Sequence, residues 1–284
     1  MVMVTTASGQ RQKFNAKKIY RTCIRAGASR GLASEIVREV EERLYDGIPT
    51  RKILQLVLDA LERHQAPVVA SRYDLKSAMM RMGPAGFAFE TFLAEVFRHY
   101  GYRALLRQHI QGRCVMHEVD IVLEKDEVRT MVEVKYHNAA GIYTGLKEAM
   151  YTYSRFLDLK EGHESGTCQQ FDKALLATNT RSSSEARQYA LCKGIQLLGW
   201  KYPTKAGLEK MIEGKCLYPV TVLRIDAGSL AALGRADIML AMDLATNDPR
   251  QISRMTGLPQ AKAEQLSVQA RSLLDATLRP ECRT

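Results

Sequence analysis

Two acids and a lysine near the middle of the chain, Asp120, Glu133 and Lys135, lie in a segment where apolar and polar residues alternate. The alternation runs over residues 112–137 and breaks at a polar tip, 126–127, which predicts a β-hairpin with its acids on one face. With the tip at this position, Asp120 faces Glu133 across the two strands, and Lys135 shares the face of Glu133. Opposed carboxylates repel each other unless a divalent cation lies between them, and Mg²⁺ or Mn²⁺ accepts such oxygen ligands. The spacing therefore predicts a metal site beside an ammonium group.

A solvated strand face explains the same residues without any site. In that interpretation Glu118 forms a salt bridge with Lys135. A slip of one residue in the strand register would also remove the pairing of Asp120 with Glu133. The hairpin alone leaves both interpretations open, so the surrounding sequence has to decide between them.

The surrounding sequence resembles a nuclease superfamily. Asp120 followed by Glu133-Val134-Lys135 is similar to the Asp…Glu-x-Lys signature of the PD-(D/E)xK nucleases. The flanking segments Gly-Phe-Ala-Phe-Glu at 86–90 and Ala-Leu-Leu-Ala-Thr-Asn at 174–179 resemble, more specifically, the Mrr-type restriction endonucleases. The resemblance covers roughly residues 84–200, and its specificity comes from the order of the elements around the triplet.

This resemblance implies a fold and a reaction. The fold is α/β, a restriction-endonuclease-like mixed sheet flanked by helices, and the reaction is Mg²⁺-dependent hydrolysis of DNA phosphodiester bonds that leaves a 5′-phosphate. The implied metal ligands are Asp120, Glu133, the Val134 carbonyl and Glu90, which lies at the margin of the apolar stripe of its predicted helix. Lys135 is expected to position the attacking water and to stabilise the transition state.

Residues 84–202 predict the elements that would position this site. The order is α-β-β-β-α-β-α-β, with a helix over 143–157, a strand over 173–178, a helix over 184–193 and a strand over 195–198. Strands that are joined through helices predict parallel pairing, here fused to an antiparallel hairpin. Four polar residues could reach the active edge or be ordinary loop residues: His137, Asn138, Asn179 and Arg181.

Residues 1–83 predict a short hairpin followed by a small helical domain. The predicted helices and N-caps are 16–25 after Asn15, 35–45 after Ser34, 51–64 after Thr50, and a last helix over 68–82.

This segment is similar to the ATP-cone domain of ribonucleotide reductases and of nucleotide-sensing repressors. The resemblance is carried by Gly9, by Lys-Phe-Asn-Ala-Lys-Lys-Ile at 13–19 and by Val-Ala-Ser-Arg-Tyr at 69–73. It implies that Lys17 and Lys18, at the start of a helix, hold the phosphates of ATP or dATP. The Lys-Arg pair of the family's hairpin is replaced here by small polar residues before Gly9, so a helical domain without a nucleotide stays an alternative.

Residues 203–284 predict a helical C-terminal domain. Within it, residues 252–266 resemble a helix-hairpin-helix, whose Gly-Leu-Pro turn would present backbone amides to a DNA phosphate near Lys262. A plain turn between two helices explains the same residues equally well.

The net charge of +10 favours a polyanionic partner such as DNA. Residues 1–83 contribute +7, residues 84–202 contribute +1 and residues 203–284 contribute +2, so the basic excess lies outside the expected nuclease core. No apolar run is long enough to predict a membrane span. The six cysteines are scattered singly, without a zinc or disulfide pattern, and the first residues do not read as a signal peptide, so a cytoplasmic protein is expected.

The sequence thus predicts a DNA endonuclease that is regulated by an adenine nucleotide. The main alternative is a nucleotide-responsive DNA-binding regulator that has an inactive nuclease fold. A third alternative, an enzyme that resolves DNA junctions, differs in substrate and would act as a symmetric homodimer.

Overall fold

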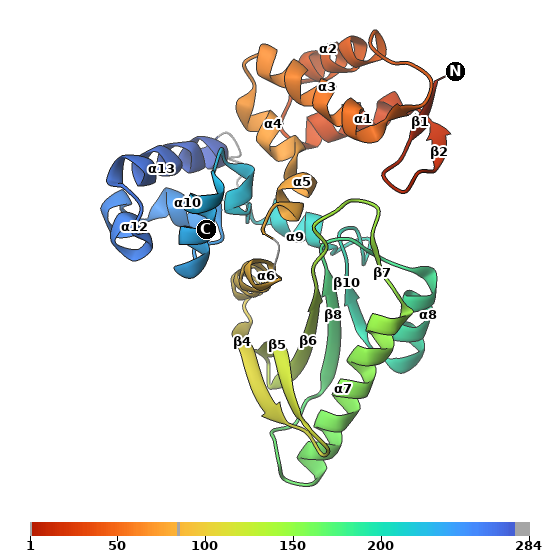
Figure 1. Ribbon diagram of the computed structural model, residues 1–284, viewed down its shortest axis with the longest axis vertical. Coiled ribbons are helices and arrows are strands. Elements are labelled where there is room, and N and C mark those ends of the chain that lie inside the picture. The colour runs from red at the N-terminus through yellow and green to blue at the C-terminus, as the bar shows by residue number, and fades with distance from the viewer. Residues whose placement is uncertain (1, 84–85, 276–284) are drawn as a thin grey trace. The chain divides into compact units, whose positions relative to one another are not determined.

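The computed structural model describes residues 2–83 and 86–275 and divides the chain into two compact units (Figure 1). The second unit is Met82–Leu217, and the first joins Met1–Arg81 to Tyr218–Thr284. The sequence predicts three domains instead, 1–83, 84–202 and 203–284. The structure differs after residue 202. Residues 203–217 pack with the second unit, and the described residues from 218 onward pack with the N-terminal segment.

The second unit extends past residue 202 because helix α9 (Leu208–Gly214) packs onto it. The Tyr100 hydroxyl donates a hydrogen bond to the Met211 carbonyl at 3.1 Å. Lys215 donates to the His99 carbonyl at 2.8 Å. The residues that follow the last strand therefore belong to the nuclease-like unit.

A five-stranded mixed sheet forms the centre of the second unit, as the sequence predicts. Its strands are β4 (Arg103–Gln111), β5 (Met116–Lys125), β6 (Val128–Lys135), β8 (Lys173–Thr178) and β10 (Gln196–Leu198). The spatial order is β10-β8-β6-β5-β4. The pairs β4–β5 and β5–β6 are antiparallel, whereas β6–β8 and β8–β10 are parallel. The α/β fold class is thereby confirmed.

The predicted register of the central hairpin is confirmed from the Ile121–Val132 pair to the Lys125–Val128 pair. The ladder ends there, so the predicted pairing of Asp120 with Glu133 is not part of it. The tip residues Asp126 and Glu127 have φ values of 51° and 64°. Positive φ at both central residues is the geometry of a two-residue turn that matches the twist of the strands. The turn therefore fixes which residues of the two strands are opposed.

Helices flank this sheet. They are α6 (Phe87–His99), α7 (Leu146–Glu164) and α8 (Ser184–Lys193), and α7 runs alongside the strands (Figure 1). Helix α6 buries Phe89, Phe92 and Leu93 completely. The predicted helix over 143–157 begins later and ends later than expected. Its first two residues, Tyr143–Thr144, instead form strand β7, which pairs in parallel with β9 (Arg181–Ser182).

One acid of α7 holds the turn between β4 and β5 against the helix. The Asp158 carboxylate accepts hydrogen bonds from the Cys114 N–H at 2.8 Å and the Val115 N–H at 3.3 Å, and contacts His117 Nε2 at 2.7 Å. The turn comes so close to the helix that a Cβ built on Gly162 would lie 2.9 Å from the Gly112 carbonyl carbon. Glycine at 162 is therefore required by this contact.

The first unit contains a small sheet and most of the helices of the chain. Its elements are β1 (Met3–Thr5), β2 (Arg11–Lys13), α1 (Ala16–Arg25), α2 (Arg30–Glu41), β3 (Ile48–Pro49), α3 (Thr50–Arg63), α4 (Pro67–Tyr73), α5 (Leu75–Met80), the 3₁₀ turn η1 (Val220–Val222), α10 (Ala227–Arg235), α11 (Ala241–Thr246), α12 (Pro249–Thr256) and α13 (Gln260–Asp275). The predicted hairpin and the predicted bounds of the first helix are confirmed.

Two expectations for this unit are wrong. Helix α2 begins at Arg30, because the Ser29 hydroxyl accepts a hydrogen bond from the Leu32 N–H, and Ser34 lies inside the helix. The single helix expected over 68–82 breaks at Asp74 into α4 and α5.

Arg72 explains why the two ends of the chain share one unit. Its side chain is 7 % exposed and donates hydrogen bonds to the Ala26 carbonyl at 3.3 Å and to the Leu273 carbonyl at 2.6 Å. A buried guanidinium that bonds α13 to the N-terminal helices makes them a common structure, since a buried charge needs such partners. Among the cysteines, Cys23, Cys114, Cys168 and Cys192 are free, whereas Cys216 is disulfide-bonded, contrary to expectation.

Gly162→Ala is predicted to destabilise the second unit by about 1–3 kcal/mol, because the added methyl group overlaps the backbone of the β4–β5 turn. The sign is diagnostic, since Gly→Ala within a helix ordinarily stabilises by up to about 1 kcal/mol. Urea unfolding followed by the fluorescence of Trp200, the single tryptophan, measures the change in this unit. Gly214→Ala, where a Cβ meets only an ordinary contact at 3.6 Å, is the control and is expected to leave the midpoint unchanged or to raise it slightly. Equal effects of the two substitutions would contradict the close contact at Gly162.

Candidate active site

Asp120 lies where the central strands lose their hydrogen bonds. The ladder between β5 and β6 ends at the Ile121–Val132 pair, and Asp120 is the next residue along β5. Its carboxylate accepts a hydrogen bond from the Val134 N–H at 2.7 Å. On the other side of β5, the pairs Leu106–Ile121 and Gln108–Val119 are formed on either side of Asp120. The acid therefore lies at an interruption of both ladders.

Glu133 is a buried carboxylate held between two cations. Its residue is 2 % exposed. Its Oε1 lies 2.6 Å from Lys135 Nζ, and its Oε2 lies 2.7 Å from Arg155 Nη1. The structure thus brings Glu133 and Lys135 together, and the ammonium group of Lys135 is engaged by Glu133 rather than by Glu118, the partner in the solvated-strand interpretation.

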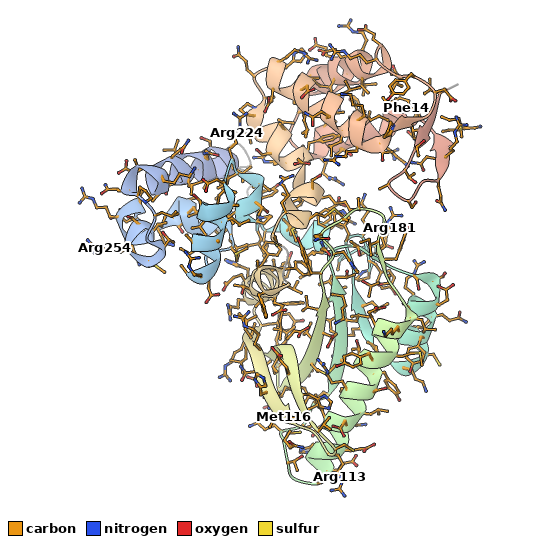
Figure 2. The ribbon with its side chains drawn as sticks, viewed as in Figure 1. Phe14, Arg113, Met116, Arg181, Arg224 and Arg254 are labelled. Atoms are coloured by element: carbon orange, nitrogen blue, oxygen red, sulfur yellow. The ribbon has the colours of Figure 1, made fainter. Side chains whose placement is uncertain are left out.

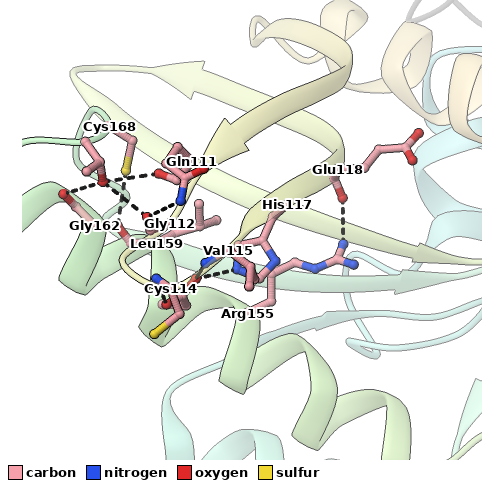
Figure 3. Close-up of polar contacts among 12 residues, drawn as sticks. Gln111, Gly112, Cys114, Val115, His117, Glu118, Arg155, Leu159, Gly162 and Cys168 are labelled. Atoms are coloured by element: carbon pink, nitrogen blue, oxygen red, sulfur yellow. Dashed lines mark hydrogen bonds and ion pairs between the residues drawn. The ribbon is translucent and has the colours of Figure 1, made fainter.

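Arg155 is a site residue that the sequence did not reveal. From helix α7 its Nη1 also donates to the Glu118 carbonyl at 2.7 Å, which fixes it to the edge of β5 (Figure 3). Its other terminal nitrogen donates to the Tyr151 hydroxyl at 2.6 Å, and the guanidinium lies over the Tyr151 ring at 4.7 Å. The one available signal was the i, i+4 spacing of Tyr151 and Arg155 on a predicted helix.

Glu90 reaches the same region from the first turn of α6. Its Oε2 is buried, has no hydrogen-bond partner and lies 3.6 Å from Arg107 Nη1. Arg107, a second residue that the sequence did not reveal, has φ of 49° and occupies the position of β4 opposite Asp120. A non-glycine residue at positive φ is uncommon, and such residues often mark functional sites.

The acids are held in an environment that disfavours their charged forms. Burial, together with the charge of Glu133, raises the pKa of Asp120 to about 6, despite the opposing hydrogen bond from Val134. Burial, followed by the charge of Asp120, raises the pKa of Glu90 to about 7, despite the nearby Arg107. Burial lowers the pKa of Lys135, but the hydrogen bond to Glu133 and the charges of Glu133 and Asp120 together outweigh burial, so the net pKa is raised. Mutually repelling carboxylates beside a protonated lysine are what an added cation would stabilise.

The donor groups fit a hard divalent cation. Asp120 and Glu90 supply carboxylate oxygens, and Glu90 Oε2, which makes no hydrogen bond and lies 3.6 Å from Arg107 Nη1, has lone pairs for an ion. The N–H and C=O of one strand residue point toward the same neighbour, so the Val134 carbonyl faces Asp120 as its N–H does. Within the described part of the chain, no three His, Cys, Asp or Glu side chains are grouped so as to hold a metal ion by themselves. Mg²⁺ commonly uses one or two carboxylates and completes its shell with water.

The polar loop residues divide into two groups. The Asn179 amide clamps the end of β6, accepting from the His137 N–H at 2.9 Å and donating to the His137 carbonyl at 2.7 Å. Burial lowers the pKa of His137. Asn138 and Arg181 are exposed. Asn179 thus stabilises the backbone at the end of β6, whereas Asn138 and Arg181 face solvent.

In the first unit, Lys17 lines a hollow of about 430 Å³ together with Tyr20, Arg21 and Ser34. Lys18 is exposed at the same helix start. Asn15, the residue before α1, makes no side-chain cap, so the helix start keeps free amide groups.

In the same unit, Lys262 is not free to reach a phosphate as it stands. Its Nζ lies 2.9 Å from the carboxylate of Asp226. Gly257, in the turn between α12 and α13, has φ of 72°, so two helices joined by a turn are present, as both the helix-hairpin-helix and the plain-turn interpretation expect.

Two family models match separate stretches of the chain. Residues 2–76 match a family described as the ATP cone domain, and residues 82–201 match a family described as restriction endonuclease. An uncharacterized protein of Archaeoglobus fulgidus is 40% identical over 182 residues, which cover 64% of this chain and 99% of that protein. The crystal structure of AF1548, a protein of unknown function, superposes with a TM-score of 0.60 at 39% identity and covers 66% of this chain and 98% of that one. Across the described residues, no helix is both long enough and apolar enough to cross a bilayer.

The raised pKa values predict that the metal-free protein loses stability between about pH 4 and pH 7. A carboxyl group with a raised pKa binds its proton more tightly in the folded state, so its contribution is present below the unfolded pKa and is lost as the pH rises through 6 for Asp120 and 7 for Glu90. Glu90→Gln is expected to reduce this loss by roughly 1–2 kcal/mol. Urea unfolding at pH 5 and pH 7.5 in EDTA, followed by Trp200, measures it.

Glu164→Gln, at the exposed end of α7, is the control and should keep the wild-type difference between the two pH values. A Glu90→Gln protein with an unreduced loss of stability would show that Glu90 does not ionise against its neighbours.

Proposed function

We propose that this chain, which belongs to the Mrr-type restriction endonucleases and carries an N-terminal ATP cone domain, is a metal-dependent DNA endonuclease regulated by an adenine nucleotide. The observation that carries the proposal is the contact between Glu133 and Lys135, at 2.6 Å, beside the desolvated carboxylate of Asp120. These are the three residues of the Asp…Glu-x-Lys signature, and they lie on two interior strands, β5 and β6, where the ladder between them ends.

The residues divide the work of phosphodiester hydrolysis between them. Asp120, Glu90 and the Val134 carbonyl would hold Mg²⁺ or Mn²⁺. Glu133, which the sequence also predicts as a ligand, has its two carboxylate oxygens engaged by Lys135 and Arg155, so we propose that it borders the site. When bound, the cation supplies charge stabilisation on the phosphoryl group and acidifies water. The Lys135 ammonium group has three N–H donors and donates one to Glu133. The other two would orient the attacking water and a phosphate oxygen.

Arg155 acts on the site through Glu133 and is a positioning residue. It holds one carboxylate oxygen of Glu133 while Lys135 holds the other. Tyr151 and the Glu118 carbonyl fix the guanidinium in turn. A carboxylate restrained from both sides keeps its orientation when substrate enters, which lowers the reorganisation that the reaction requires.

A regulator with an inactive nuclease fold would use the same DNA-binding surface and a nucleotide. It has no use for buried, mutually repelling carboxylates with raised pKa values, because these reduce the stability of the folded chain at neutral pH. The acidic cluster therefore favours the enzyme over the regulator.

Lys135→Ala is predicted to reduce Mg²⁺-dependent cleavage of DNA by at least about 100-fold, since it removes a group that acts in the transition state. Binding of DNA in EDTA is expected to change less than about threefold, because one phosphate contact contributes little to total affinity. Nicking of supercoiled plasmid and fluorescence anisotropy of a labelled duplex measure the two quantities.

Asp120→Asn should match Lys135→Ala in the cleavage assay, and Lys160→Ala, an exposed lysine on α7, should retain wild-type activity. Cleavage by Lys135→Ala at the wild-type rate would refute the assignment. Equal losses in all three variants would point to a defect in the preparation and not to the site.

Lys17→Ala is predicted to weaken binding of ATP or dATP by about tenfold, since an ammonium group at a helix start contributes directly to phosphate affinity. Isothermal titration calorimetry measures the affinity. Lys52→Ala, an exposed lysine of α3, is the control and should bind as the wild type does. Wild-type affinity in Lys17→Ala would remove the first helix from the nucleotide site.

A further inference from the structure

We propose that Tyr143 and Arg181 form a nucleotide platform beside the acidic site, on which an unpaired base stacks against the Tyr143 ring while Arg181 binds its phosphate. The platform presupposes the proposed function and adds a substrate class to it, DNA that has unpaired nucleotides next to the bond that is cleaved. Neither residue belongs to the Asp…Glu-x-Lys signature.

The register of two short strands brings these side chains together. Strands β7 and β9 run parallel, with Tyr143 paired to Arg181 and Thr144 paired to Ser182. Paired residues of neighbouring strands share a face, with their Cα atoms about 5 Å apart, and successive residues point to opposite faces. Tyr143 is 48% exposed and Arg181 is exposed, whereas Thr144 and Ser182 are buried. A ring and a guanidinium therefore lie side by side on the solvent face.

A buried network fixes the platform from below. The Thr144 hydroxyl donates to the Thr178 hydroxyl at 3.0 Å and lies 3.1 Å from His137 Nε2. The Thr178 and Thr180 hydroxyls are 3.2 Å apart, and the Ser183 N–H donates to the Thr144 carbonyl at 2.9 Å. Because the backbone under Tyr143 is already ordered, a base can stack on the ring without the cost of ordering a loop.

The platform lies near the position expected for the scissile phosphate. Lys135 is paired with Thr178 across β6 and β8, and Arg181 follows Thr178 by three residues. A strand pair spans about 5 Å and three residues span at most about 11 Å, so the backbone of Arg181 lies within about 16 Å of that of Lys135. Consecutive phosphates of one DNA strand advance about 3.4 Å along the helix, so one strand can touch both residues. Arg181 is labelled in Figure 2.

The residues next to Tyr143 also suit a nucleic acid base. An exposed apolar surface continues along the loop and the first two turns of α7, over Ile142, Leu146, Met150 and Tyr151, which are 44%, 39%, 47% and 51% exposed. Large apolar residues gathered at the surface mark binding sites. Lys147, in the same turn, and Arg181 add positive charge, and Glu148 is engaged by the Gly145 N–H at 2.9 Å. Cations interleaved with aromatic rings are complementary to single-stranded DNA.

The full-length chain in EDTA, where no cleavage is expected, allows binding to be measured alone. Two labelled DNAs of equal length are compared by anisotropy, a fully paired duplex and the same duplex with a single-stranded flap that carries 2-aminopurine beside the branch. Tyr143→Ala is expected to weaken flap binding by about tenfold, to leave duplex binding within about twofold and to abolish the quenching of 2-aminopurine. Tyr143→Phe keeps the ring and should bind as the wild type does.

Arg181→Ala is expected to weaken both DNAs and to reduce the salt dependence of binding by about one phosphate contact. Tyr45→Ala, an exposed tyrosine of the first unit at 55%, is the matched control and should change nothing. Equal binding of the two DNAs by wild type and Tyr143→Ala would overturn the platform, as would a change in oligomeric state with unchanged DNA binding.

Failure of the platform and failure of the proposed function are distinguishable. A wild-type protein that cleaves paired DNA with Mg²⁺ and shows no effect of Tyr143→Ala on flap binding overturns the platform alone. A wild-type protein that neither binds nor cleaves any of these DNAs overturns both. Circular dichroism of Tyr143→Ala and Tyr143→Phe verifies that the fold is retained in each comparison.

Discussion

The buried carboxylate of Glu133, held between Lys135 and Arg155, is the interaction on which the arrangement of the second unit depends. A buried charge is tolerated only with well-placed partners, and removal of one partner is strongly destabilising. Lys135 comes from the same strand as Glu133, but Arg155 comes from α7. The ion pair therefore fixes the position of α7 along the direction of the strands. The bonds of Asp158 to the β4–β5 turn, one helical turn after Arg155, fix the same helix a second time.

Asp120 adds the complementary constraint, because it occupies a sheet position without taking part in a regular ladder. Arg107 opposite it adopts positive φ, and the Val134 N–H turns to its carboxylate. A non-glycine residue at positive φ and a buried carboxylate are both unfavourable in a regular β-sheet. Departures of this kind concentrate where a fold retains a site for chemistry.

The hairpin could be predicted from sequence because its register depends on local rules. A period-two pattern and a two-residue tip determine which residues are opposed, and both are visible in residues 112–137. Arg155 and Arg107 could not be predicted, since one reaches Glu133 across 22 residues and the other depends on a backbone angle. Strands β7 and β9 contain two residues each, too few for a periodic signal. The shared unit of the two chain ends depends on Arg72 and Leu273, which are 201 residues apart.

That separation has a consequence for the order in which the protein is made. The chain enters Met82–Leu217 after completing α4 and α5 and returns to the first unit only at Tyr218. At a synthesis rate of about 5–20 residues per second, α13 leaves the ribosome roughly 10–40 s after α4. The whole five-stranded sheet, from β4 to β10, is synthesised within this interval, before the Leu273 carbonyl becomes available to accept the hydrogen bond of the Arg72 guanidinium.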